Sequence, residues 1–346
     1  MKAMLLTGIG RLEMATVPDL EIRHDTDVLI RLGVVGVCGS DVHYYTTGRI
    51  GSQVVKFPFT VGHECSGVVE RVGPGVTRVK PGDRIAVEPA ISCGRCDQCT
   101  VGRPHTCRNI RFLGTPPTSG CLSERLVMPE ECCFPVGSGT SLELAALVEP
   151  LSVAVYSVKQ SIPMLGATVG ILGAGPIGLG VLQVARLGGA AAIYVTDKID
   201  SRLAAARDAG ACWTANPDKA DVAAKILEAQ PLGLDIVFEC CGQQDALDQG
   251  TRMLRPGGKL MVVGIPQADR ISFMPDVVRR HEICIQHVRR QVHCVQPALD
   301  MVESGSLDPR FMATHRFGFE QTAEAFEMVR QYSGGVIKAM IHLAGE

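Results

Sequence analysis

The sequence has no block of charge of one sign and no long apolar run. Its 34 Lys and Arg residues nearly balance 36 Asp and Glu residues, for a formal net charge of −2, which disfavours nucleic acid or anionic lipid as partners. No segment approaches the ~20 apolar residues that span a bilayer. The opening stretch, MKAMLLTGIGRLEM, lacks the apolar core and small-residue cleavage site of an export signal. We therefore expect a cytoplasmic protein whose partner is a small molecule.

Cysteine, by contrast, is plentiful, with 14 residues. We expect no export signal, and 346 residues can form a core without disulfide cross-links. Metal binding therefore explains the cysteines better than disulfides do. The length also exceeds the roughly 250 to 300 residues at which a single core stops growing. Two domains are therefore expected.

The residue pattern changes twice along the chain. Short β-type runs broken by Gly, Pro and Asp turns fill residues 1–155 and predict antiparallel β-structure. Residues 156–287 alternate apolar strands with amphipathic helical stretches, which is typical of βαβ units on a parallel sheet. Residues 288–346 change pattern again, and we expect them to return to the first domain. The predicted fold class is α/β.

A glycine-rich turn predicts a dinucleotide site. Gly173, Gly175 and Gly178, with Pro176 and Ile177 between them, follow the strand TVGIL and open a helix. Asp197 ends the next strand, near the ~20-residue offset at which an acid meets the ribose hydroxyls and favours NAD over NADP. Asp197 could instead be an ordinary helix cap. Arg202 could flank the adenosine or be a solvated surface residue.

Four cysteines, Cys93, Cys96, Cys99 and Cys107, occupy the stretch SCGRCDQCTVGRPHTC. Four thiolates this close can surround one Zn²⁺ as a tetrahedron. The ferredoxin run also starts with cysteines spaced by two, but it continues with three residues and a Cys-Pro pair, which this chain lacks. The spacing favours a closed zinc site that stabilises structure and does no chemistry.

Three dispersed segments supply further metal-ligand types: CGSDVH around Cys38, GHECSG around His63, and LVEPLSV around Glu149. Together with the four-cysteine stretch and GAGPIG, they resemble the zinc-containing medium-chain alcohol dehydrogenase family, in particular its sorbitol and xylitol dehydrogenase branch. The resemblance covers nearly the whole chain. It implies a GroES-like β-rich catalytic domain with an inserted Rossmann domain, and a homotetramer, with a homodimer as the alternative.

The resemblance also implies residue roles. Cys38 and His63 are catalytic zinc ligands, and Glu64 and Glu149 are the acidic groups at the metal, with the choice of ligating glutamate left open. Ser40 takes the proton of the substrate hydroxyl and passes it toward His43, while hydride goes to NAD.

Substrate contacts are implied at Tyr44, Phe112 and Arg290. Many sorbitol dehydrogenases carry Phe-Arg-Tyr in the region where this chain has VRRQVHC. The tyrosine is therefore missing, and either Arg289 or Arg290 could be the matching arginine. The expected reaction is oxidation of a polyol secondary alcohol to a ketose. Threonine or a simple secondary alcohol is the alternative substrate, and a catalytically silent NAD-binding protein is the rival from another class.

Overall fold

The computed structural model describes residues 1–343 and divides the chain into two compact units. Unit 1 combines Met1–Glu149 with the residues from Val295 onward, and unit 2 is Pro150–Cys294. The last part of the chain thus packs with the first. The domain limits expected at residues 155 and 287 stay a prediction.

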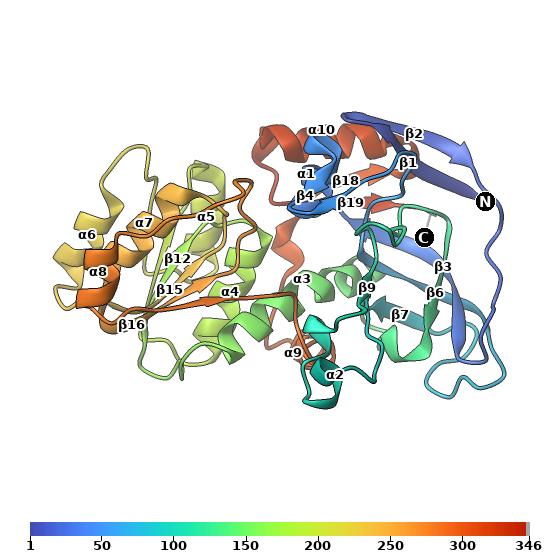
Figure 1. The fold of residues 1–346 in the computed structure, drawn as a ribbon, viewed down its shortest axis with the longest axis horizontal. Helices are drawn as coiled ribbons and strands as arrows, with labels where there is room; N and C mark the ends of the chain where they lie inside the picture. Colours follow the sequence, from blue (N-terminus) through green and yellow to red (C-terminus); the bar gives the residue numbers. More distant parts are fainter. Residues whose placement is uncertain (344–346) are drawn as a thin grey trace. The chain divides into compact units, whose positions relative to one another are not determined.

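Unit 1 is built on a mixed, mainly antiparallel sheet that has seven strands within the described residues. The strand order is β11-β7-β6-β3-β19-β18, and β10 also pairs with β3. In Figure 1 the red strand β19, from the end of the chain, lies beside the blue strand β3, and β18 lies on the other side of β19. The bounds are β3 Asp27–Gly36, β6 Glu64–Val72, β7 Arg84–Val87, β10 Arg125–Pro129, β11 Cys133–Pro135, β18 Ala313–Gly318 and β19 Lys338–His342.

Smaller elements complete unit 1. Within residues 1–343, three two-stranded sheets are β1 Lys2–Gly8 with β2 Arg11–Thr16, β4 Arg49–Ile50 with β5 Gln53–Val54, and β8 Ala90–Ile91 with β9 Arg111–Phe112. The helices are α1 Gly39–Thr47, α2 Asp97–Thr100, α9 Val295–Glu303 and α10 Thr322–Gln331. Helix α3, Leu142–Lys159, carries the chain from unit 1 into unit 2.

The sheet register of unit 1 brings two predicted ligand segments together. Gly36, the last residue of β3, pairs with Glu64, the first residue of β6. A core of fully buried side chains that includes Ile30, Leu32 and Ile85 supports these strands. Cys38 follows the end of β3, and His63 precedes the start of β6. Because the two strands are antiparallel neighbours, their register places both residues at the same end of the strand pair.

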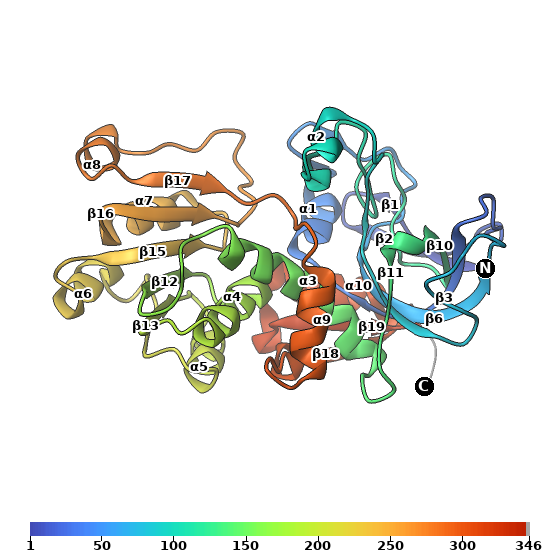
Figure 2. The same ribbon diagram turned by 90° about the horizontal axis from the view of Figure 1, so that it is seen from below.

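Unit 2 is a parallel sheet, as the alternating pattern predicts. Within the described residues it has six strands in the order β14-β13-β12-β15-β16-β17, and every pairing is parallel. Figure 2 shows β17, β16, β15 and β12 following one another across the sheet. The strands are β12 Thr168–Leu172, β13 Ala192–Thr196, β14 Trp213–Ala215, β15 Leu234–Glu239, β16 Leu254–Val262 and β17 Cys284–His287.

Helices α4 Pro176–Leu187, α5 Asp200–Asp208, α6 Val222–Ala229, α7 Gln244–Met253 and α8 Pro275–Arg280 connect these strands. The order reverses at β12, where β13 lies on one side and β15 on the other. In open parallel sheets, ligands bind at the carboxyl ends of strands at such a reversal. Over residues 1–343, no helix is both long enough and apolar enough to cross a bilayer.

Candidate functional site

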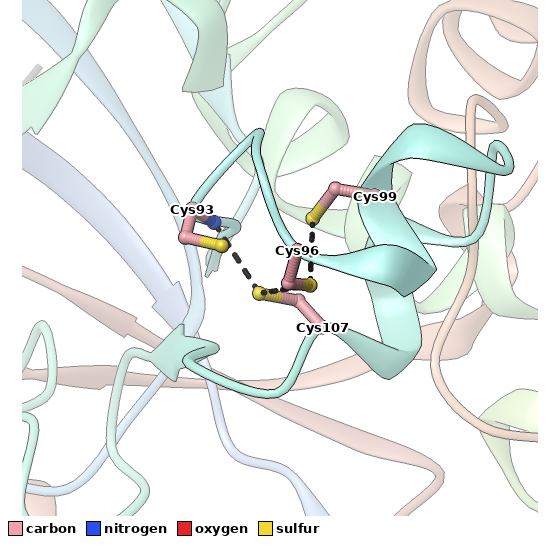
Figure 3. Close-up of side chains that lie close together, drawn as sticks. All are labelled: Cys93, Cys96, Cys99 and Cys107. Atoms are coloured by element: carbon pink, nitrogen blue, oxygen red, sulfur yellow. Dashed lines mark hydrogen bonds between the residues drawn. The ribbon is translucent and has the colours of Figure 1, made fainter.

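The four cysteines form one compact group in unit 1. Their sulfur atoms all lie within 4.8 Å of one another, with 3.6 Å between Cys96 and Cys99 and 3.8 Å between Cys96 and Cys107. Figure 3 shows the side chains converging from the loop and the start of helix α2. Zn–S bonds of 2.3 Å in a tetrahedron give sulfur–sulfur edges of about 3.8 Å. The spacing therefore fits a single zinc ion.

The backbone of this lobe also suits thiolate ligands. The N–H groups of Cys93 and Asn109 both donate to Cys107 Sγ at 3.3 Å, as expected for a sulfur that carries negative charge. Backbone N–H donors from Arg95 and Cys96 lower the pKa of the Cys93 thiol to about 6. Burial and the neighbouring thiols raise the pKa of Cys99 to about 11, so filling the site must displace at least one proton at neutral pH.

A second group of metal-ligand types contains Cys38, His63 and Glu64. One donor atom from each lies within 4.8 Å of the others. His63 and Glu64 are buried, at 6% and 1% exposure, while Cys38 is half-buried. Sulfur, nitrogen and oxygen donors in this number fit a zinc site with three protein ligands and one position left for a water or substrate.

Asp41 orients the histidine of this group. Its Oδ1 accepts the backbone N–H of Gly62 at 3.0 Å and lies 3.2 Å from His63 Nδ1. Its Oδ2 accepts the N–H of Cys38 at 3.3 Å. A proton on Nδ1 that bonds to the carboxylate leaves Nε2 free to bind a metal. Sequence reasoning missed this role, although Asp41 lies inside the CGSDVH motif.

The charges around His63 also suit a bound cation. Burial lowers the pKa of His63, but Asp41 and Cys38 raise it by more, so that it lies well above the ordinary imidazole value. Negative groups that hold a proton this firmly would equally stabilise a metal ion in its place.

The two candidate glutamates differ in position. Glu64 belongs to the three-residue group, whereas Glu149 is not among its members in the described part of the chain. Burial, opposed by His63 and supported by Glu64, raises the pKa of Glu149 to about 7. The geometry favours Glu64 as the third ligand, and direct ligation by Glu149 stays a prediction.

Ser40 and His43 lie on helix α1, which begins directly after Cys38. The Ser40 hydroxyl donates to Cys38 Sγ at 3.3 Å, which places it beside the ligand group. His43 is three residues further, hence on the same side of the helix. Burial lowers the pKa of His43, so the neutral ring, which can accept a proton, prevails at neutral pH.

Of the expected substrate contacts, Phe112 lies at this site and Tyr44 lies in the core. The ring centroid of Phe112 is 5.3 Å from that of His63. Tyr44 is 2% exposed and belongs to the main core cluster of unit 1, so it offers little surface to a ligand. Arg290 belongs to unit 2, where its backbone has a positive φ of 54°. The substrate role of Arg290 stays a prediction.

The glycine turn of unit 2 has the geometry of a phosphate-binding loop. It joins β12 to α4. A Cβ on Gly178 would lie 1.8 Å from the carbonyl oxygen of Gly173, so close packing forbids any side chain there. A Cβ on Gly175 would meet only Arg202, at 3.7 Å, and its φ of −75° suits any residue. The protein itself does not require glycine at position 175, whereas an approaching pyrophosphate would.

Asp197 and Arg202 flank this turn. Asp197 Oδ2 accepts the N–H of Ala174 at 2.7 Å, and its Oδ1 accepts the N–H of Ile199 at 2.8 Å. The carboxylate therefore caps the following loop and also ties it to the glycine turn. Arg202 is buried, at 7% exposure, and a guanidinium nitrogen would lie 3.7 Å from a Cβ on Gly175. The interpretation of Arg202 as a solvated surface residue is therefore wrong.

Comparison with known proteins agrees with both halves of this description. Residues 24–138 match the alcohol dehydrogenase GroES-like domain, and residues 176–304 match the zinc-binding dehydrogenase family. Sorbitol dehydrogenase of Bacillus subtilis is 36% identical over 99% of this chain and 97% of its own length. L-idonate 5-dehydrogenase of Vitis vinifera is 38% identical over 92% of this chain and 88% of its own length.

Among solved structures, an Escherichia coli oxidoreductase of unknown specificity superposes with a TM-score of 0.94 at 31% identity, covering 99% of both chains. The expected fold class, a GroES-like domain with a Rossmann domain, is confirmed. The chain therefore belongs to the zinc-binding dehydrogenases that carry an alcohol dehydrogenase GroES-like domain.

Proposed function

We propose that this chain oxidises a secondary alcohol of a polyol, of the sorbitol or xylitol type, to the ketose, with NAD as the hydride acceptor. The observation that carries the proposal is the group of Cys38, His63 and Glu64, whose donor atoms lie within 4.8 Å of one another. Three protein ligands with one open position are the mark of catalytic zinc, whereas the four-cysteine group has the closed donor set of a structural site.

Zinc at this group would act as a Lewis acid that lowers the pKa of a substrate hydroxyl. The residues of the chain supply the rest. Asp41 holds His63 in the tautomer that leaves Nε2 free. Ser40, beside Cys38, accepts the hydroxyl proton, and His43 on the same helix face receives it for release to solvent.

The choice of NAD over NADP rests on Asp197. Its carboxylate lies next to the glycine turn, bonded to the N–H of Ala174 at 2.7 Å. Negative charge at that place would repel a 2′-phosphate. Arg202, directed at Gly175, would supply positive charge close to the pyrophosphate.

The substrate class rests on the relatives and on the polarity of the site. Two of the relatives are named for sorbitol and for L-idonate. A carboxylate ligand in place of a thiolate makes the metal surroundings more polar, which suits a substrate with several hydroxyl groups. Phe112, with its ring 5.3 Å from that of His63, would form one wall of the substrate site.

A substrate panel tests the proposal. Initial rates of NADH formation should give the highest kcat/KM with a polyol among xylitol, sorbitol, galactitol, threonine and 2-butanol, and NAD should be preferred over NADP. Threonine or 2-butanol as the best substrate by a wide margin would replace the polyol with the alternative substrate class. No turnover of any of the five, in protein that contains zinc, would favour a silent NAD-binding protein.

We also propose a cytoplasmic homotetramer, with a homodimer as the alternative. The proposal rests on the family resemblance. Sedimentation equilibrium against the chain mass of 36.9 kDa distinguishes the two assemblies.

A further inference from the structure

A buried lysine reaches the metal-ligand group from the far end of the chain. Lys338 begins strand β19 in the sequence KAMIH and is 2% exposed. Its ammonium donates to both carboxylate oxygens of Glu64, at 2.7 and 2.6 Å, and to the carbonyl oxygen of Val37 at 3.2 Å. The three protons of the ammonium are therefore all used.

Those acceptors belong to the two segments that carry the metal ligands. Val37 immediately precedes Cys38, and Glu64 immediately follows His63. A Cβ on Gly36 would lie 2.4 Å from Glu64 Oε2, so a glycine at this position leaves the room that the carboxylate occupies. The Lys338–Glu64 pair is thus built into the sheet beside the ligand group.

We propose that Lys338 is a positioning residue that shares the Glu64 carboxylate with the metal and so keeps Glu64 a weak, displaceable ligand. The inference rests on the proposed metal centre, but it does not depend on which alcohol is the substrate.

The physical argument is competition for the same lone pairs. Both oxygens of Glu64 bond to an ammonium in a buried site, so any charge that the carboxylate gives to a metal is reduced. The positive charge of Lys338 also offsets the negative charge of Glu64. The centre therefore stays electropositive, and a substrate oxygen can enter it.

Stability alone gives a weak reason for this pair. A buried ion pair pays a large desolvation penalty, and well-packed apolar residues in its place are often as stable or more stable. Two residues further along β19, Met340 is fully buried in an apolar cluster, so the same strand already contains a well-packed apolar side chain of this kind. A lysine at position 338 is better explained by what it does to Glu64.

The test uses full-length zinc-loaded protein with the substitutions Lys338→Met and Lys338→Gln. Zinc release to a chromogenic chelator and steady-state turnover are measured on the same samples. We expect release from the Cys38–His63–Glu64 site to slow by about 10- to 100-fold while kcat falls, because the charged hydrogen bonds that Lys338 takes from the Glu64 carboxylate become available to the metal. Release from the four-cysteine site should not change, which provides an internal reference.

A purely structural role predicts the opposite pattern, in which zinc retention and activity fall together. Met340→Ala, which creates a cavity in the same strand and leaves the Lys338–Glu64 pair unchanged in sequence, should show that pattern of a damaged core. Lys338→Arg, which keeps the charge, should restore most of the wild-type release rate. Faster zinc release in both neutral variants would overturn the proposal.

The double variant Glu64→Gln/Lys338→Met covers the case in which Lys338→Met alone fails to fold, since it leaves no unpaired buried charge. Its zinc release should equal that of Glu64→Gln, because Lys338 acts through Glu64. A zinc release rate of the double variant that differs from that of Glu64→Gln would contradict the proposal. All these readouts follow zinc, so a failure of the polyol assignment would not alter them.

Discussion

Replacing Cys96 by serine gives a sharp test of the four-cysteine lobe. Cys96 is the central ligand, with its sulfur 3.6 Å from that of Cys99 and 3.8 Å from that of Cys107. Loss of a hydrogen-bond partner that only orients a metal ligand already weakens metal binding by about 10- to 100-fold, so loss of one of four direct ligands should exceed about 100-fold. The metal content should therefore fall from two zinc ions per chain, one for each ligand group, to one.

The lobe has little else to hold it in place. Helix α2 has four residues, and none of them is buried. Without the metal we expect residues 93–108 to open, which exposes the peptide bonds after Arg95 and Arg108 to trypsin. Unit 2 should remain uncut, because it has its own core.

The assay is zinc analysis combined with limited trypsin digestion and mass spectrometry. Cys284→Ser is the matched control, since Cys284 is exposed on β17 and belongs to neither ligand group. For the wild-type lobe, zinc affinity should also rise with pH below the Cys99 pKa of about 11, by about ten-fold per pH unit for each proton displaced. A Cys96→Ser protein that keeps two zinc ions and resists trypsin as the wild type does would refute the reasoning.

Three other outcomes follow from the structure. Cys38→Ser should reduce turnover by more than about 100-fold with little change in the Kd for NAD, measured by fluorescence titration. Gly175→Ala should raise that Kd by about ten-fold at unchanged Tm, because position 175 has room for a Cβ, whereas Gly178→Ala should lower Tm as well. Asp235→Asn should cost about 2 kcal/mol of stability at pH 7, since the carboxylate accepts two hydrogen bonds from Thr168 at 2.7 Å. Burial raises the pKa of Asp235, but these bonds and the Arg255 cation lower it by more, so the deficit in Tm should shrink as the pH falls below 3.8.

Features whose parts are close together in the sequence were predictable from it. The four cysteines lie within 15 consecutive residues, so their spacing alone restricts the geometry that one metal ion can impose. The glycine turn is equally local, since a strand, a turn and a helix follow one another directly. The parallel sheet of unit 2 follows from the repeated alternation of strand and helix patterns.

Contacts between distant segments required the tertiary structure. Lys338 and Glu64 are 274 residues apart, and the sequence hinted at their contact only by placing one lysine in the apolar run VIKAMIHL, where a buried charge needs a partner. The family resemblance implies that Tyr44 contacts the substrate, but the packing of α1 places Tyr44 in the core. The strand register between Gly36 and Glu64 brings Glu64 together with Cys38 and His63. A sequence shows directly which side chains it carries and which of them are neighbours along the chain. Which distant side chains meet depends on how separate strands pair, and that pairing is fixed only when the whole sheet has formed.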